Sequence, residues 1–200
     1  MKKFSYTIYW ILQWTWGFIM TFIGGVAALG LILTGHKPHK LGPNIYFTIG
    51  RDWGGVSFGP FFFCCENVSN EILYHESGHS LQNIVWGPLM PFAIGIPSFV
   101  RYHLRNQPTR IKKNIFNFSF LIISFLFFSM CIGITGVTFR LHILTHFLEF
   151  LRDYLICISI WLTLVEIPKY DCGQGPDYDD IWFEGQATRW GMEVFKKKED

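Results

Sequence analysis

The stretch "LYHESGHSLQ", residues 73–82, holds two histidines four residues apart, with a glutamate directly after the first of them. On a helix, side chains at positions i and i+4 share one face, with about 5–6 Å between their Cβ atoms. Two imidazoles at that spacing can reach one zinc ion at about 2.0–2.1 Å. The pattern H-E-x-x-H therefore predicts a zinc-binding helix on which His75 and His79 are ligands. Glu76 lies about 100° around the helix from His75 and is predicted to be the general base.

The residues around this motif predict a helix over residues 70–86. Gly87 and Pro88 end it, and Gly78 would let another backbone pack close to the metal. The alternative interpretation is a polar helix face whose histidines only make hydrogen bonds at the surface. Candidates for the N-cap are Asn67, Ser69 and Asn70.

A catalytic zinc site of this kind needs a third protein ligand and one open position for water. The segment "DYDDIWFEGQATRWG", residues 177–191, offers two carboxylates four residues apart, Asp180 and Glu184. A helix over residues 180–195, capped by Asp179 or Asp180, would place both on one side. Ala187 and Gly191 continue that side with small residues that permit close packing against the histidine helix.

With these two segments, the chain resembles the gluzincin metallopeptidases, in which one helix carries H-E-x-x-H and a later helix carries a glutamate ligand. "EGQAT", residues 184–188, is similar to the E-x-x-A-D element of the membrane-bound M48 peptidases, and the first block is similar to small uncharacterised bacterial H-E-x-x-H proteins. The resemblance implies that zinc is bound by His75, His79 and Glu184 and that Glu76 is catalytic, with Asp180 as the main rival to Glu184. Thr188 stands where that family has an aspartate. Candidates for stabilising an oxyanion are Tyr178, His103 and Arg189.

Long apolar segments predict an integral membrane protein. Half of the 200 residues are hydrophobic and 16% are charged, against roughly 25% in ordinary soluble domains. Residues 6–33 contain no Asp, Glu, Lys or Arg and exceed the roughly 20 residues of a spanning helix. Residues 114–139 predict a second span. Residues 142–166 predict a third span or an interfacial helix, because Glu149, Arg152 and Asp153 interrupt them, and Glu149 and Arg152 could pair on one helix face.

Between the first two spans, residues 83–100 are apolar but carry three prolines, which predicts a re-entrant or interfacial segment instead of a regular span. A basic cluster without acids follows and is expected to be cytoplasmic by the positive-inside tendency. With the first span running inward, residues 36–113 and the carboxyl-terminal segment are then both cytoplasmic. The opposite topology leaves more basic residues outside. The cluster comprises Arg101, Arg105, Arg110, Lys112 and Lys113.

Residues 45–65 predict a short β-hairpin around a Gly-rich turn. In peptidases of the resembled type, an edge strand before the metal helix holds an extended substrate by backbone pairing. "VSFGPFFF", residues 56–63, could serve in that way; packing against the helix or a membrane-interface aromatic patch is the equal alternative.

Composition also limits the partners. A net charge of +2 and the absence of a basic-aromatic stripe argue against nucleic acid. The five cysteines are odd in number and lack C-x-x-C spacing, so we expect reduced, mostly buried thiols. The expected partners are a peptide or protein substrate and the lipid bilayer, while the sequence names no protein partner.

The sequence thus predicts a mainly α integral membrane protein, one domain over residues 1–200, with two or three transmembrane helices. A minimal zincin-like metal-binding helix pair and a short β-hairpin complete it. The expected function is that of a membrane-bound zinc metallopeptidase in a bacterial-type cytoplasmic membrane, with a cytoplasmic active site. The alternatives are a non-catalytic zinc-binding membrane scaffold and a site-2-like intramembrane protease. The polar segment before His75 argues against the last of these.

Overall fold

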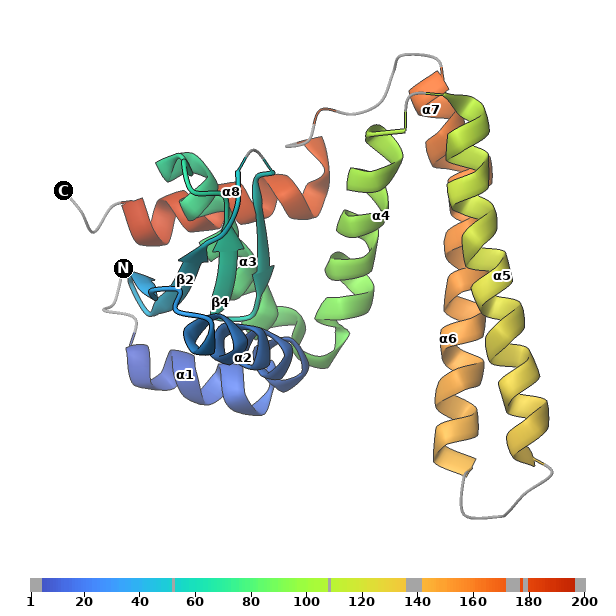
Figure 1. The fold of residues 1–200 in the computed structure, drawn as a ribbon, viewed down its shortest axis with the longest axis horizontal. Helices are drawn as coiled ribbons and strands as arrows, with labels where there is room; N and C mark the ends of the chain where they lie inside the picture. Colours follow the sequence, from blue (N-terminus) through green and yellow to red (C-terminus); the bar gives the residue numbers. More distant parts are fainter. Residues whose placement is uncertain are drawn as a thin grey trace. The chain divides into compact units, whose positions relative to one another are not determined.

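The structure is a computed structural model that describes residues 5–51, 53–107, 109–135, 142–171, 177 and 180–196 (Figure 1). Contacts divide the chain into two compact units, Met1–Ser98 with Pro176–Asp200, and Phe99–Gly175. The single domain predicted over residues 1–200 stays a prediction. The described chain is mainly helical, as predicted, with a small sheet in the first unit.

The first unit opens with two helices, α1 (Tyr6–Thr15) and α2 (Phe18–Leu33), which meet at an angle of 99°. One continuous span had been predicted over residues 6–33. The bend lies at Gly17, whose carbonyl accepts a hydrogen bond from Asn83 Nδ2 at 3.1 Å. The same amide donates to Gln13 Oε1 at 2.6 Å. Buried polar groups thus tie the bend to a later helix, which a straight apolar helix in lipid would not allow.

A four-stranded sheet follows, in the order β1-β2-β4-β3. A hairpin is present within the predicted range 45–65, because β3 and β4 pair in antiparallel fashion, but the same range also holds β2, which pairs with β4 in parallel and with β1 in antiparallel fashion. All four residues of β4 are buried, so this strand takes an inner position and β3 lies at the edge. Strands buried on both faces read as continuous apolar runs, as the sequence "FFFC" does. The strands are β1 (His39–Leu41), β2 (Asn44–Thr48), β3 (Gly55–Phe58) and β4 (Phe61–Cys64).

The predicted histidine helix is present as α3 (Asn70–Trp86). The Ser69 hydroxyl accepts a hydrogen bond from the backbone N–H of Ile72 at 3.4 Å and caps its first turn. The helix ends at Gly87, which has a φ of 51° and would place a Cβ 2.3 Å from Trp16 Nε1. Only glycine fits this position, since it combines a left-handed backbone with close contact to an indole.

The proline-rich segment after α3 is broken, as the sequence predicted. A 3₁₀ turn η1 (Gly87–Leu89) and a π-helical turn η2 (Pro91–Gly95) lead into α4 (Ile96–Arg105). Residues 70–89 and 91–105 meet at 116°. Because no straight helix crosses this break, α3 is not part of a regular span.

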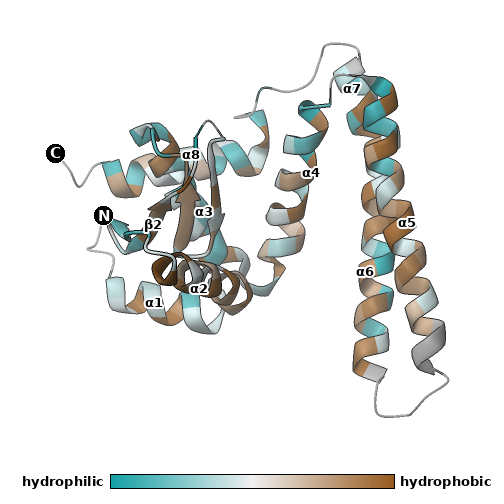
Figure 2. Cartoon of the chain, in the orientation of Figure 1, coloured by the Kyte–Doolittle hydropathy of each residue, from teal (hydrophilic) through white to brown (hydrophobic). Residues whose placement is uncertain are grey.

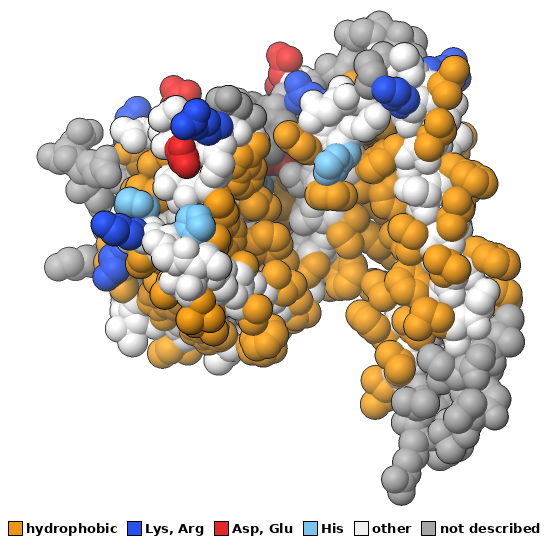
Figure 3. All heavy atoms as spheres, viewed as in Figure 1, with side chains coloured by type: hydrophobic (Ala, Val, Ile, Leu, Met, Phe, Trp, Pro, Cys, Tyr) orange, Lys and Arg blue, Asp and Glu red, His pale blue; other side chains and the backbone are white. Residues whose placement is uncertain are grey.

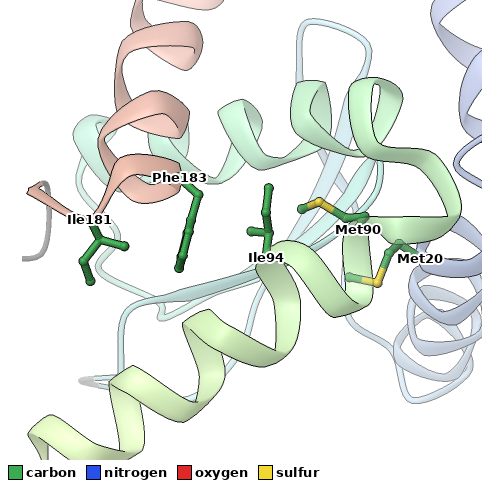
Figure 4. Packing of buried hydrophobic residues seen from close by; sticks show 5 residues of the cluster. All are labelled: Met20, Met90, Ile94, Ile181 and Phe183. Atoms are coloured by element: carbon green, nitrogen blue, oxygen red, sulfur yellow. The ribbon is translucent and has the colours of Figure 1, made fainter. Parts of the chain in front are cut away.

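The last described helix, α8 (Trp182–Phe195), corresponds to the predicted helix over residues 180–195. Its N-cap is Ile181, without a side-chain hydrogen bond, so the predicted cap by Asp180 is wrong; Asp179 lies outside the described residues. Asp180 is exposed. Apolar packing holds this end of the helix instead, in a row of side chains from α2, the segment around η2 and the start of α8 (Figure 4): Met20, Met90, Ile94, Ile181 and Phe183.

The second unit contains α5 (Arg110–Thr135), α6 (His142–Trp161), a π-helical turn η4 (Leu162–Glu166) and α7 (Ile167–Asp171). Among the described helices, one is long and apolar enough to cross a membrane, over Arg110–Cys131. Up to three candidate spans result if each of the two bent helix pairs counts as one broken span. The predicted second span over residues 114–139 thus begins earlier, and its end falls outside the described residues.

Glu149 and Arg152 on α6, predicted to pair with each other, each have a different partner. Arg152 Nε lies 2.7 Å from Asp153 Oδ1, and His146 Nδ1 lies 3.0 Å from Glu149 Oε2. Three ionisable groups within two turns explain why α6 does not meet the composition of a spanning helix by itself.

Along α5 and α6, hydrophobic residues alternate with hydrophilic ones (Figure 2), and apolar side chains cover much of the face that Figure 3 displays, while several polar side chains are buried. Asn117, Ser124, Thr145 and Ser159 are at most 8% exposed. Asn117 Nδ2 donates to Thr163 Oγ1 at 2.7 Å, and Ser159 Oγ donates to Asn117 Oδ1 at 2.9 Å. Large apolar side chains point outward, among them Ile115, Phe118, Phe125, Leu126, Phe147 and Leu164. This distribution is the reverse of that in a water-soluble helix pair.

Candidate metal centre

The two helices that carry the predicted ligands touch through their backbones. A Cβ on Gly78 of α3 would lie 1.9 Å from the carbonyl oxygen of Ala187 on α8. A Cβ on Gly191 would lie 1.8 Å from the carbonyl oxygen of Tyr74. The predicted close packing through these small residues is therefore confirmed, and it brings the two helix faces within reach of one ion.

The predicted ligand atoms converge where these faces meet. His75, His79 and Glu184 each offer one donor atom, and these atoms lie within 4.8 Å of one another. The two Nε2 atoms are 3.1 Å apart, and Glu184 Oε2 lies 3.3 Å from that of His75 and 3.1 Å from that of His79. Three ligands of a tetrahedral ion with bonds of about 2.0–2.1 Å are separated by about 3.3–3.4 Å. The triangle therefore has the size that such an ion requires.

Hydrogen bonds on the far side of each ring fix which nitrogen points inward. The Thr188 hydroxyl donates to the Glu184 carbonyl at 3.2 Å, so it accepts from His75 Nδ1 at 2.8 Å. Gln82 Nε2 donates to the Phe183 carbonyl at 2.7 Å, so its Oε1 faces His79 Nδ1 at 2.7 Å. Both imidazoles consequently carry their proton on Nδ1 when neutral and present a lone pair on Nε2.

Three acceptor atoms thus face one another at short range, which requires a cation among them. Glu184 is fully buried, and its Oε2 makes no well-aligned hydrogen bond to any residue that the structure describes. Its Oε1 accepts from the hydroxyl of Ser98, at the start of α4. A buried carboxylate oxygen left in this way is costly unless a proton or a metal ion sits between it and the imidazoles. Two imidazoles and one carboxylate are also a common donor set for zinc.

The electrostatics of the metal-free site agree with this need for a cation. Burial by itself would raise the pKa of Glu184, but the close approach of His75 and His79 to its carboxylate holds it well below its usual value. Burial lowers the pKa of His79, but the hydrogen bond and charge of Glu184 outweigh it and raise the pKa to about 9. Without a metal, a proton is therefore held at the position that an ion would take.

Glu76 lies beside this triangle and is not one of the group. It is 5% exposed, and burial raises the pKa of its carboxyl above the usual value, more than the nearby histidines lower it. Its side chain lies against the edge strand, because a Cβ on Gly55 of β3 would be 2.6 Å from Glu76 Oε1. A buried, more basic carboxylate between an edge strand and a possible metal site is suited to proton transfer.

The other predicted site residues are not part of this group. Asp180 is exposed and outside the ligand triangle, and Arg189 is exposed as well. His103 belongs to the second unit, where it packs against Phe99 and Tyr102, and Tyr178 lies outside the described residues.

Sequence reasoning missed two of the supporting groups. Gln82 follows His79 by three residues and so shares its helix face, a spacing that could have identified it. Ser98 carries no comparable signal, because it meets Glu184 only through the fold. Thr188 stands where the resembled family has an aspartate, and its hydroxyl contacts His75 Nδ1.

Comparison with known proteins adds no assignment: no protein-family model, curated protein or solved structure matches the chain. The residues themselves thus carry the argument about function.

Proposed function

We propose that this chain is a membrane-associated zinc metallopeptidase. The observation that carries the proposal is the convergence of three inward-facing acceptor atoms, from His75, His79 and Glu184, at the separation that a tetrahedral ion needs. Among the residues that the structure describes, three protein atoms meet there, which would leave a fourth position for water or substrate. Asp180 would then play no part in binding the metal.

When bound, zinc would supply a Lewis acid that polarises the scissile carbonyl and makes a coordinated water more acidic. The other parts of the reaction belong to the chain. Glu76 takes the proton of the attacking water on a carboxylate oxygen as the water oxygen bonds to the carbonyl carbon. The carbon–nitrogen bond then breaks, and Glu76 gives the proton to the leaving amine nitrogen. Burial raises the pKa of Glu76 above its usual value and so makes its carboxylate a stronger base.

The edge strand β3 supports a peptide as substrate. Its one neighbour in the described sheet is β4, and Gly55 on it touches Glu76. An extended peptide added to β3 by backbone pairing would pass close to the proposed base. This arrangement favours peptide hydrolysis over chemistry on a small molecule.

The membrane association rests on the second unit. The apolar length of Arg110–Cys131 and the reversed distribution of polar and apolar side chains on α5 and α6 support insertion in lipid. The basic residues from Arg101 to Lys113 favour a cytoplasmic position for the end of the second unit at which α5 begins, in a membrane of bacterial type.

Two alternatives remain distinct from this proposal. A zinc-binding scaffold would keep the ion and lack hydrolysis. A site-2-like intramembrane protease would need the histidine helix within the bilayer, and the 116° bend after α3 argues against a regular span there.

The deciding experiment uses the full chain purified in detergent, its zinc content, and hydrolysis of a mixed peptide library. We expect Glu76→Gln to retain zinc and to lose at least about a thousandfold in hydrolysis, because the general base is removed. Glu66→Gln, an exposed carboxylate on the same unit paired with Arg51, is the matched control and should stay active. Retained zinc with no hydrolysis that depends on Glu76 would favour the scaffold instead.

A further inference from the structure

A second group of polar side chains lies in the second unit, at the end of the hairpin where α5 begins and α7 ends. We name this group the α7 cluster, and it comprises Arg101, Arg105, Lys113, Glu166 and Tyr170. Arg101 Nη2 donates to Glu166 Oε1 at 2.9 Å, and its guanidinium carbon lies 4.9 Å from the centre of the Trp161 ring. Glu166 is 1% exposed, so the cluster is anchored on a buried carboxylate.

Lys113 lies beside Tyr170, and the charge of Arg105 also acts on it. Lys113 is 9% exposed, and its Nζ lies 5.5 Å from the centre of the Tyr170 ring. Burial and the Glu166 charge raise the pKa of the Tyr170 hydroxyl, while the charges of Arg105 and Arg101 lower it. The charges of Glu166, Arg105 and Arg101 therefore all act on the Tyr170 hydroxyl, which stays protonated at neutral pH.

Two oxygen atoms of the cluster are buried without a hydrogen-bond partner among the residues that the structure describes. They are Glu166 Oε2 and the Tyr170 hydroxyl oxygen. Burying a carboxylate oxygen without a hydrogen-bond donor costs more free energy than burying an unpaired neutral group. The site is therefore built for a ligand that brings hydrogen-bond donors.

The local backbone also marks this position. Glu166 is the last residue of the π-helical turn Leu162–Glu166, between α6 and α7. Such turns occur mainly as single insertions in helices, and frequently at functional sites. Glu166, at the end of this turn, is the residue that pairs with Arg101.

The cluster lies at the beginning of the candidate span Arg110–Cys131, the depth at which lipid headgroups meet a spanning helix. Cations at that depth attract phosphate, whereas a buried carboxylate oxygen disfavours a ligand that is only anionic. A metal ion is disfavoured by three cations beside one carboxylate. A group that carries a phosphate and a primary ammonium satisfies both halves of the cluster.

We propose that the α7 cluster binds the headgroup of an aminophospholipid of the phosphatidylethanolamine type. The ammonium donates to Glu166 Oε2 and the Tyr170 oxygen, and the phosphate pairs with Arg105 and Lys113. A phosphatidylcholine headgroup has no N–H to donate, and phosphatidylglycerol has no cation. This inference goes beyond peptide hydrolysis, and it rests on the membrane association proposed above.

The test is native mass spectrometry of the full chain in detergent, titrated with phosphatidylethanolamine, phosphatidylcholine or phosphatidylglycerol of identical acyl chains. The wild type should bind phosphatidylethanolamine at least about tenfold more tightly than either competitor, since charge-assisted hydrogen bonds to the buried carboxylate depend on the N–H groups. Glu166→Gln should abolish this preference, and Tyr170→Phe should reduce it. Glu149→Gln on α6 removes the same charge from a more exposed position and should keep it.

Circular dichroism of each variant separates loss of folding from loss of lipid. Equal binding of the three lipids by the wild type, or a preference that survives in folded Glu166→Gln, would overturn the proposal. Soluble phosphoethanolamine should not displace the lipid at an equal concentration; displacement would overturn the assignment to a membrane lipid. Zinc content does not enter any of these readouts, so failure here leaves the proposed peptidase separately testable.

Discussion

Gln82 and Thr188 decide which nitrogen of each histidine faces Glu184. The Gln82 amide and the Thr188 hydroxyl each donate a hydrogen bond to a backbone carbonyl of α8. Each therefore offers only an acceptor oxygen to the imidazole beside it. These contacts hold both rings in the form that binds metal, before any metal arrives.

Replacing Gln82 with alanine should therefore weaken zinc binding by about 10–100-fold, the range for lost partners of ligating histidines. Competition with a chromophoric chelator measures this dissociation constant. Gln186→Ala, which removes only one acceptor for Gln82, is the control and should change it much less. An unchanged affinity in folded Gln82→Ala would show that the ring orientation does not depend on this amide.

The pH dependence of zinc binding follows from His79. Its pKa of about 9 in the metal-free site means that zinc displaces a proton below that pH. Apparent affinity should thus rise by roughly tenfold per unit between pH 7 and 9 and flatten above it. Calorimetry in two buffers of different ionisation enthalpy should detect about one proton released per zinc at pH 7. Heats that do not depend on the buffer would contradict this assignment.

At this scale the sequence predicted which residues lie together, because periodicity reports which residues share a helix face; that His75, His79 and Glu184 bind a metal stays a prediction. His75 and His79 are fixed by their spacing, and the small residues after Glu184 indicated the close packing. Ser98 could not be predicted, since its contact with Glu184 depends on how α4 returns after a break. Asp180 failed as a cap because apolar packing of Ile181 and Phe183 holds the start of α8 instead.

At the scale of elements, the contact between α3 and α8 determines whether a site exists. The helices approach until Gly78 touches the Ala187 carbonyl, which leaves no space for a methyl group. The metal triangle depends on this distance, because its three atoms come from both helices.

Gly78→Ala should force the helices apart, lower the free energy of unfolding by about 1–3 kcal/mol or more and abolish zinc binding. Gly30→Ala is the matched control, because a Cβ there meets nothing within 4 Å, and it should be neutral or slightly stabilising. Thermal unfolding in detergent with zinc analysis measures both effects. A zinc-loaded Gly78→Ala variant of normal stability would contradict the packing.

The elements that sequence reasoning misjudged depend on tertiary contacts. β2 pairs with β4 in parallel because β4 lies between β2 and β3 in the sheet. A local sequence pattern does not reveal this strand order. The bend at Gly17 depends on Asn83, some 66 residues later in the chain. In both places, the sequence predicted correctly that the segment is apolar, but it did not predict which distant segment it contacts.

At the scale of the whole molecule, the ligands come from two ends of the first unit, with the second unit inserted between them. If α5 and α6 cross a membrane as proposed, the assembled group of His75, His79 and Glu184 requires both ends of the first unit on the same side of it. The apolar hairpin would then leave that side and return to it.

Single cysteines at Ser69 and at Asp177 should therefore react alike with a membrane-impermeant maleimide, and in intact cells neither should react before permeabilisation. The parent chain labelled in parallel corrects for its own cysteines, of which Cys157 is exposed. Labelling of the two positions from opposite sides would be incompatible with the assembled site.

The most direct test of the metal centre is the zinc content of the purified full chain, measured for the wild type, Glu184→Ala and Asp180→Ala. We predict one zinc per chain in the wild type and in Asp180→Ala, and almost none in Glu184→Ala, because the third ligand is lost. Full zinc in a folded Glu184→Ala variant, or its loss in Asp180→Ala alone, would contradict the site described above.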